Sequence, residues 1–156
     1  GASIAKPTTL HFPGGGKKCS GARENGLRQG RWTWWHENGL LWAVGSYENG
    51  VKTGLWTFWH ENGQKDCEGE YTGGQKHGLW NYWHMNGQLD AQGEYFHGVE
   101  DGPWVDWYEN GQKEEEGQYR NGSKSGTWKY WTKNGSRHWR LDHRADAQEA
   151  GPSFAE

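Results

Sequence analysis

Histidine followed by glutamate is the first pair of residue types here whose side chains could do chemistry. The pairs are His36–Glu37 and His60–Glu61, and a third histidine, His84, lies a further 24 residues along. A histidine beside a carboxylate can act as a general acid or base, and histidines that converge can bind zinc. The constant spacing argues against catalysis, because a catalytic centre is normally unique and is not copied along a chain.

Geometry argues against both roles if the histidines recur every second strand of a sheet. Successive histidines would then lie about 9.6 Å apart, whereas a zinc ligand lies about 2.0–2.1 Å from the metal. Successive strand residues also point to opposite faces, so a histidine and the next glutamate would not meet one substrate. We therefore predict no metal site, no cofactor, no catalytic residue and no enzyme activity, and we expect exposed histidines beside turns.

The two cysteines, Cys19 and Cys67, are 48 residues apart. In a regular sheet this spacing places them roughly 19 Å apart, beyond the limit of about 7 Å between the Cα atoms of a disulfide. The equivalent positions hold Ala43 and Ala91, which indicates small packed residues. Their oxidation state stays open.

An internal repeat of 24 residues must position all of these side chains. Its main motif is G-x-W-x-Ar-W-x-x-N-G, where Ar is usually aromatic. The copies are GRWTWWHENG (30–39), GLWTFWHENG (54–63), GLWNYWHMNG (78–87), GPWVDWYENG (102–111) and GTWKYWTKNG (126–135). A second motif lies between them, as GSYENG (45–50), GEYTGG (69–74), GEYFHG (93–98) and GQYRNG (117–122).

Aromatic-rich segments bounded by Asn-Gly or Gly-Gly are typical of strands joined by tight turns. The repeat therefore predicts an all-β fold, an elongated single-layer antiparallel β-meander built from five 24-residue β-hairpins. Residues 1–18 are interpreted as an expression scar and linker or irregular N-terminal cap, and residues 143–156 as a polar tail. The repeat array spans 19–142, with copies 19–42, 43–66, 67–90, 91–114 and 115–138 and a partial sixth copy, 139–142.

Strand alternation predicts which aromatic rings share a face. If Asn38 and Gly39 are the central residues of a two-residue turn, Trp32 lies opposite Gly45 and Gly30 opposite Tyr47, so that a ring can shield bare backbone. One face then carries the ladders Trp32, Trp56, Trp80, Trp104, Trp128 and Tyr47, Tyr71, Tyr95, Tyr119. The other face carries Trp35, Trp59, Trp83, Trp107 and Trp131.

Composition limits the classes of function. Burial must come from aromatic rings, because the 156 residues include 13 Trp and 26 Gly but only 31% hydrophobic residues. A net charge of -3, from 17 basic and 20 acidic residues, gives no basic stripe, so we predict no nucleic-acid binding. No apolar run reaches the roughly 18 residues of a membrane helix.

A single layer cannot bury both faces, so the aromatic ladders are candidate binding residues as well as the packing of the fold. Our first prediction is a protein partner, because Trp and Tyr are enriched at interface hot spots; the second is an envelope glycan or a lipid. Asp106 interrupts the row Trp34, Phe58, Tyr82 and Tyr130, either as a polar anchor for a ligand or as a drifted surface position. The open edges of the end strands predict end-to-end self-association.

The pattern E-N-G-Q-K-x-x-x-G-x-Y-x-x-G-x-x-x-G-x-W-x-x-W-x-x-N-G at 61–87 and 109–135 resembles the bacterial variant of the MORN repeat. The resemblance covers about residues 19–142 and implies an elongated hairpin array. Some members of that family are antitoxins of the YwqK type, and others are scaffolds or have been proposed to bind lipid. An antitoxin-like role implies a cytoplasmic protein, whereas a signal peptide removed from the chain would indicate the periplasm or cell surface.

Overall fold

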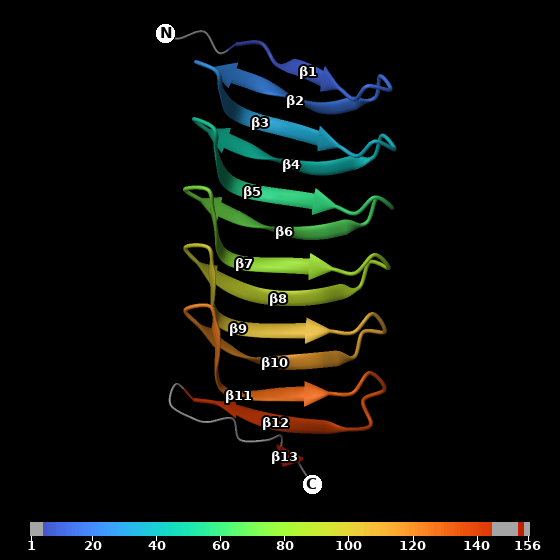
Figure 1. The fold of residues 1–156 in the computed structure, drawn as a ribbon, viewed down its shortest axis with the longest axis vertical. Helices are drawn as coiled ribbons and strands as arrows, with labels where there is room; N and C mark the ends of the chain where they lie inside the picture. The colour runs from blue at the N-terminus through green and yellow to red at the C-terminus, as the bar shows by residue number, and fades with distance from the viewer. Residues whose placement is uncertain (1–4, 145–152, 155–156) are drawn as a thin grey trace.

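The computed structural model describes residues 5–144 and 153–154, which form one open antiparallel sheet with its strands in sequence order (Figure 1). This confirms the all-β meander. Its thirteen described strands are β1 (Thr8–His11), β2 (Lys17–Glu24), β3 (Leu27–Trp35), β4 (Leu41–Glu48), β5 (Val51–Trp59), β6 (Lys65–Thr72), β7 (Gln75–Trp83), β8 (Leu89–Phe96), β9 (Val99–Trp107), β10 (Lys113–Arg120), β11 (Ser123–Trp131), β12 (His138–His143) and β13 (Ser153–Phe154).

Two-residue turns connect each even strand from β2 to β10 to the next odd strand. Both residues of each turn have positive φ, as in Asn49 (φ 49) and Gly50 (φ 79). This is the type I′ geometry for which Asn-Gly is the preferred sequence, since its twist matches that of the flanking strands. The Asn-Gly pairs at these ends of the hairpins are therefore the turn residues that the sequence predicts.

The turns after β3, β5, β7 and β9 differ from the two-residue turn expected at Asn38 and Gly39. In the first of them the His36 N–H donates to the Leu40 carbonyl at 2.8 Å, the Gly39 N–H donates to the His36 carbonyl at 3.0 Å, and only Gly39 has positive φ. This is a three-residue loop followed by a bulge in β4. Trp34 pairs with Ala43 but Trp35 pairs with Leu41, so Trp42 is the extra residue. The bulge absorbs the extra residue, so the predicted pairing of Trp32 with Gly45 holds.

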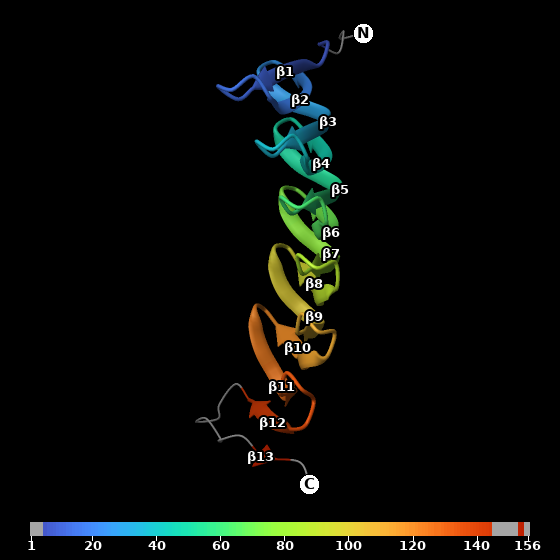
Figure 2. The same ribbon diagram turned by 90° about the vertical axis from the view of Figure 1, so that its right-hand side faces the viewer.

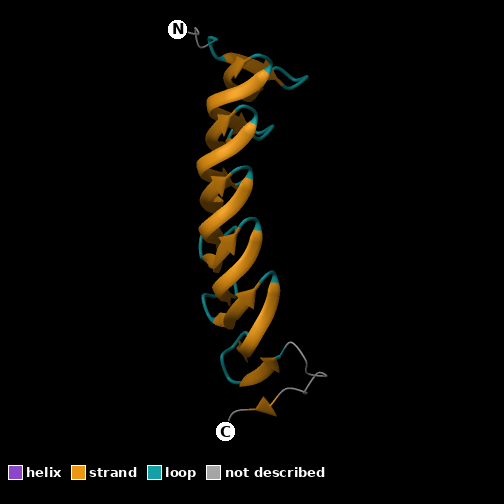
Figure 3. Ribbon diagram, turned by 90° about the vertical axis from the view of Figure 1, so that its left-hand side faces the viewer, coloured by secondary structure: helices purple, strands orange, loops and turns teal. Residues whose placement is uncertain are grey.

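The odd strands are sharply bent, which the sequence reasoning did not foresee. In β3, Ser20 pairs with Thr33 but Ala22 pairs with Gln29, so β3 holds two extra residues at Gly30, whose φ is 64. Equivalent shifts occur in β5, β7, β9 and β11. Extra residues of this kind bend a strand and increase its twist. The stack of strands in Figures 2 and 3 is therefore a curled ribbon rather than a flat sheet.

Curling encloses one tryptophan from each copy. Trp32, Trp56, Trp80, Trp104 and Trp128 are only 1%, 1%, 0%, 8% and 0% exposed. Each ring lies against a glycine of the preceding strand, as Trp56 does on Gly45 and not on Gly69, the glycine that it pairs with on the following strand. The prediction that an aromatic ring covers a glycine is thus right in kind, but the covered glycine belongs to the other neighbouring strand. Tyrosines pack edge-on between successive tryptophans, with Tyr47 5.0 Å from Trp56 between ring centroids.

The ends of the array continue the sheet. β1 pairs with β2, and the Phe12 N–H donates to the Gly16 carbonyl at 2.8 Å, as in the longer turns of the repeats. The glycine run at 14–16 therefore lies in the turn between β1 and β2. Of the polar tail, β13 pairs with β12; the expected expression scar and the rest of the tail beyond Arg144 lie outside the described residues.

Candidate functional site

The histidine column joins successive copies through hydrogen bonds. Nε2 of His36, His60 and His84 lies 2.8, 2.7 and 2.7 Å from the carbonyl oxygen of Trp59, Trp83 and Trp107, respectively. A carbonyl only accepts, so Nε2 carries the proton in each case. These histidines are half-buried, so the expectation of exposed side chains is wrong. Among the described residues no group of three or more His, Cys, Asp or Glu side chains could hold a metal ion.

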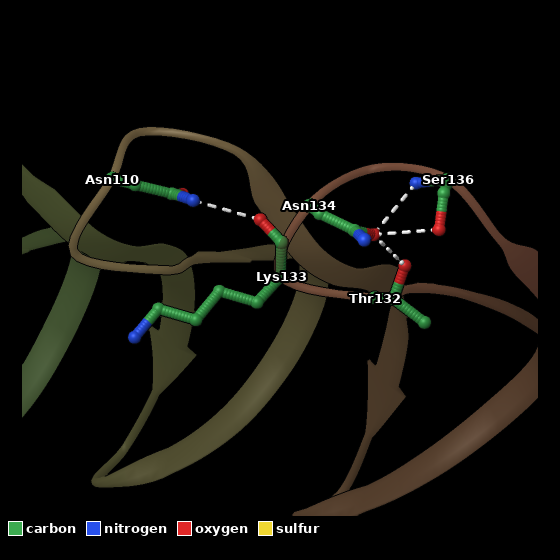
Figure 4. A pocket seen from close by; sticks show the side chains of 5 residues that line it. All are labelled: Asn110, Thr132, Lys133, Asn134 and Ser136. Carbon is green, nitrogen blue, oxygen red and sulfur yellow. Dashed lines mark hydrogen bonds between the residues drawn. The ribbon is translucent and has the colours of Figure 1, made fainter.

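The turn asparagines form a second column of bonds. Nδ2 of Asn110 donates to the Lys133 carbonyl at 2.7 Å, and the other asparagines at this position make the same bond to the next copy. Asn134, in the last such turn, instead accepts from Thr132 and Ser136 (Figure 4). These residues line an open depression of ≈ 480 Å³. It is the end of a structural column, because the side-chain oxygen of Asn134 is bonded within its own turn.

The cysteines are packing residues of the sheet. Cys19 is buried opposite Trp34, and Cys67 lies opposite Tyr82. Both are free thiols. Burial raises the pKa of the Cys67 thiol to about 11, and the charge of Asp66 adds to this rise. The thiol therefore stays protonated at neutral pH, and only a thiolate would be an effective nucleophile.

We call the face that carries Trp32 and its equivalents the inner face and the face that carries Trp35 and its equivalents the outer face. The five inner tryptophans, although candidate binding residues, offer a partner almost no surface. In Trp32, Trp56, Trp80 and Trp128 the indole N–H also donates to a carbonyl of the preceding strand, as Trp80 Nε1 does to that of Glu70 at 3.1 Å. The tyrosine ladder Tyr47, Tyr71, Tyr95 and Tyr119 packs between them. Both ladders therefore form the core.

A cation covers the inner aromatic rings in four of the five copies. Nζ of Lys52 lies 5.0 Å from the ring centroid of Trp56, 5.5 Å from that of Phe58 and 5.0 Å from that of Tyr71. Arg28, Lys76 and Lys124 occupy the same position in their copies. We call each such set of rings and cation an aromatic box. Cations over ring faces are attracted by the ring quadrupole. The chain itself therefore supplies the cations that cover the rings of this face.

Asp106 stands where the other boxes have an aromatic ring. It is half-buried and pairs across strands with Glu115, in a column that otherwise holds Cys19, Ala43, Cys67 and Ala91. Burial raises the pKa of Asp106 to about 7, and the hydrogen bond to Glu115 and the charge of Glu115 add to the rise. The sequence singled out Asp106, but its carboxylate neighbour was missed because the β9–β10 register was needed to bring the two together.

The outer ladder Trp35, Trp59, Trp83, Trp107 and Trp131 is half-buried. Lysines lie over three of its rings: Lys17 over Trp35 at 5.5 Å, Lys65 over Trp83 at 5.4 Å and Lys113 over Trp131 at 5.7 Å. The outer rings are therefore accessible in part, with every second ring face occupied by a cation of the chain itself.

Two leucines make the most exposed apolar feature of the outer face. Leu55 and Leu79 are 57% and 51% exposed and occupy the same position of successive copies. Each pairs across strands with an exposed glutamate, Glu70 or Glu94. We call Leu55, Glu70, Leu79 and Glu94 the outer leucine patch. The sequence analysis did not predict this patch, although leucine occurs at the same repeat position in two successive copies.

Fold and surfaces together define a repeat protein of the hairpin-meander class, stabilised by contacts between neighbouring copies. Residues 28–49, 52–72 and 100–121 match the family model of the MORN repeat variant. Each match covers most of an odd strand and the whole of the even strand that follows it. MORN repeats are generally binding modules for proteins or membranes and are generally not enzymes. No curated protein matches the chain. No helix among the described residues is long and apolar enough to cross a membrane.

Proposed function

We propose that the chain is a non-enzymatic binding module whose partner is a protein, and that the outer leucine patch is part of the contact surface. The observation that supports this proposal best is that Leu55 and Leu79 are both exposed at the same position of successive copies. Exposed apolar side chains that are grouped and rimmed by polar groups are typical of interaction sites. The remaining aromatic ladder of this face lies within the same copies and enlarges the surface.

Charge favours a protein over a membrane as the partner. Glu70 and Glu94 stand beside the two leucines, and neither forms an ion pair with a described residue. An anionic lipid surface attracts basic segments and repels carboxylates. A protein surface with an apolar centre and basic rim complements the patch.

A glycan stacked on the outer tryptophans is the second candidate. Sugar rings stack on open aromatic faces, and the outer ladder recurs in all five copies. Lys17, Lys65 and Lys113 already cover three of the five rings, so a polymer would have to displace them. We therefore rank the protein partner first.

The test compares wild-type protein with the Leu55→Glu/Leu79→Glu variant as immobilised bait for proteins of the host lysate. Leu10→Glu is the matched control, since Leu10 is 51% exposed but lies on β1, outside the patch. We expect a partner that wild type and Leu10→Glu retain and the double variant loses, with unchanged circular dichroism in all three. Equal retention by the double variant would refute the role of the patch. Binding to phosphatidylserine vesicles or to cell-wall polymer without a protein partner would refute the ranking.

The resemblance to the MORN repeat variant supports a finer proposal, that the chain neutralises its partner as an antitoxin does. If so, expression of the captured partner alone inhibits growth, and co-expression with this chain restores it. Co-expression with the Leu55→Glu/Leu79→Glu variant should fail to restore growth.

End-to-end self-association through β1 is also still a proposal. It rests on the four exposed residues of that edge strand and is tested by sedimentation at increasing concentration.

A further inference from the structure

Four of the five copies place a cation over the rings of the aromatic box. The fourth copy along the chain does not. A box consists of a cation, a tryptophan four residues later, an aromatic ring six residues later and a tyrosine nineteen residues later, which His143 replaces in the box of Lys124. In the box of Lys76, Nζ lies 4.7, 5.2 and 5.1 Å from the ring centroids of Trp80, Tyr82 and Tyr95. The corresponding residues of the fourth copy are Glu100, Trp104, Asp106 and Tyr119.

The fourth box therefore keeps two rings but loses its own cation. Trp104 and Tyr119 remain edge to face, as the corresponding pairs of the other copies do, but their ring centroids are 5.4 Å apart instead of 6.1 to 6.3 Å. Two carboxylates replace the cation and the third ring. Both rings and both carboxylates attract a positive charge, so the box still suits a cation although it has none of its own.

The neighbouring cations are held elsewhere. Lys76 donates to the Tyr82 hydroxyl at 2.8 Å inside its own box. Lys124 donates to Glu115 at 2.7 Å and to the Tyr130 hydroxyl at 3.2 Å. Within residues 5–144, neither Glu100 nor Asp106 forms an ion pair.

The backbone and the indole also change in this copy alone. Gly102 has φ 120, whereas the glycines at this position in the other copies have φ between 64 and 74, and Pro103 follows it. Trp104 turns its Cε3 edge to Gly93, while the other inner tryptophans present Cδ2 to their glycines. Trp104 is also the most exposed of the five, at 8% against 0 or 1%. The ring of Trp104 is therefore slightly less enclosed than its equivalents at the box that lacks a cation.

We infer that the box of Glu100, Trp104, Asp106 and Tyr119 binds the terminal ammonium group of a lysine side chain that a protein partner presents. The ammonium takes the place that Lys52, Lys76 and Lys124 fill in their own boxes, over the rings of Trp104 and Tyr119 and between the two carboxylates. A lysine stem lies along ring surface while its charged head is paired, as in the filled boxes. This inference rests on the proposed protein partner, but it concerns the inner face and not the outer leucine patch.

The test titrates the whole chain with the peptide acetyl-Gly-Lys-Gly-amide and follows the indole N–H signals in ¹H–¹⁵N spectra. The Trp104 signal is assigned with Trp104→Phe. We expect saturable movement of the Trp104 signal, and none with the peptide in which norleucine replaces lysine. The matched variant is Glu100→Lys, which supplies the cation that three other copies place there and which their folding shows to be compatible with the repeat. We expect it to weaken peptide binding about tenfold or more, the range of a desolvated cation–π contact joined to an ion pair.

Each outcome decides between the alternatives. No movement of the Trp104 signal, equal movement with the norleucine peptide, or undiminished binding to Glu100→Lys would overturn the inference. The Leu55→Glu/Leu79→Glu variant should bind the lysine peptide as wild type does, because its substitutions lie on the outer face. Failure of the peptide titration with intact partner capture therefore refutes the box alone, and failure of capture with intact titration refutes the outer surface alone.

Discussion

Gly69→Ala tests whether the glycines under the inner tryptophans are required by close approach of the rings. A Cβ at residue 69 would lie within 3.0 Å of three atoms of the Trp80 ring, closer than real Cβ atoms come to any neighbour. The ring cannot retreat freely, since it is 0% exposed and packs edge-on against Tyr71 with centroids 5.1 Å apart. Its indole N–H is also fixed on the Glu70 carbonyl.

The expected loss of stability combines two costs. Overpacking a filled core costs roughly 1–3 kcal/mol, and weakening the indole hydrogen bond costs about 1 kcal/mol. We therefore expect Gly69→Ala to lower the free energy of unfolding by about 3 kcal/mol, or the melting temperature by roughly 6–12 °C for a chain of this size. Gly16→Ala is the control, because Gly16 has no heavy atom within 4 Å of its hypothetical Cβ and no positive φ.

Urea unfolding followed by circular dichroism measures the effect. A double-mutant cycle with Trp80→Leu identifies its cause, because Gly69→Ala should cost less than about 1 kcal/mol once the ring is gone, a coupling of about 2 kcal/mol. A Gly69→Ala protein as stable as Gly16→Ala would refute the close approach. An equal cost in the Trp80→Leu background would assign the loss to the backbone instead of the ring.

Three further predictions follow from single side chains. The pKa of Asp106 is raised from 3.8 to about 7 in the folded chain, so its contribution to stability is present below pH 4 and is lost as the pH rises through 7; the full shift is worth about 4 kcal/mol, and partial exposure reduces this to about 2 kcal/mol. Asp106→Asn should therefore gain about that much on the wild type between pH 4 and pH 8, and parallel pH profiles in thermal melts would contradict the shift. Asn62→Ala removes the 2.7 Å bond to the Met85 carbonyl and should cost about 1 kcal/mol, visible as faster amide exchange in that turn. His60→Ala leaves the Trp83 carbonyl without its partner and should cost about 1–2 kcal/mol, while added zinc should change the melting temperature of neither protein.

The strands, their order and much of their pairing were predictable because the repeat fixes them locally. Asn-Gly pairs and alternating aromatics define hairpins without reference to distant residues, and the pairing of Trp32 with Gly45 follows from counting alone. The longer turn at His36 did not change this predicted pairing, because a bulge beside the turn restores the register. The wrong turn length therefore altered the predicted pairing only beside the turn.

The curl of the sheet could not be predicted, and with it the distribution of the rings between core and surface. Gly30 and its equivalents are invariant in the repeat, but a glycine can mark a bulge, a close approach or a turn, and only coordinates separate these uses. Once the odd strands bend there, Trp56 moves over Gly45 instead of Gly69, and the inner face closes. The same curl brings His36 to the Trp59 carbonyl, which is why a residue expected to be exposed is half-buried.

The fourth copy shows how a repeat array can hold a specialised site at little risk to the fold. Each copy is stabilised by its neighbours, so a local loss is shared across two interfaces and does not spread along the array. The core contacts of Trp104 persist, with Tyr95 and Tyr119 at 5.6 and 5.4 Å, so the copy can lose a cation and a ring and still remain joined. Partly buried carboxylates without a paired cation are costly, and Glu100 and Asp106 are two such groups. Both lie near Tyr119, whose pKa is raised by burial, lowered by Lys124 and raised again by Glu115, Asp106 and Glu100. Of these three carboxylates, Glu115 is the one that forms an ion pair within the described residues, with Lys124 at 2.7 Å. A ligand that carries the missing positive charge offsets that cost only while it is bound, which makes the least stable box of the array the one best suited to recognition.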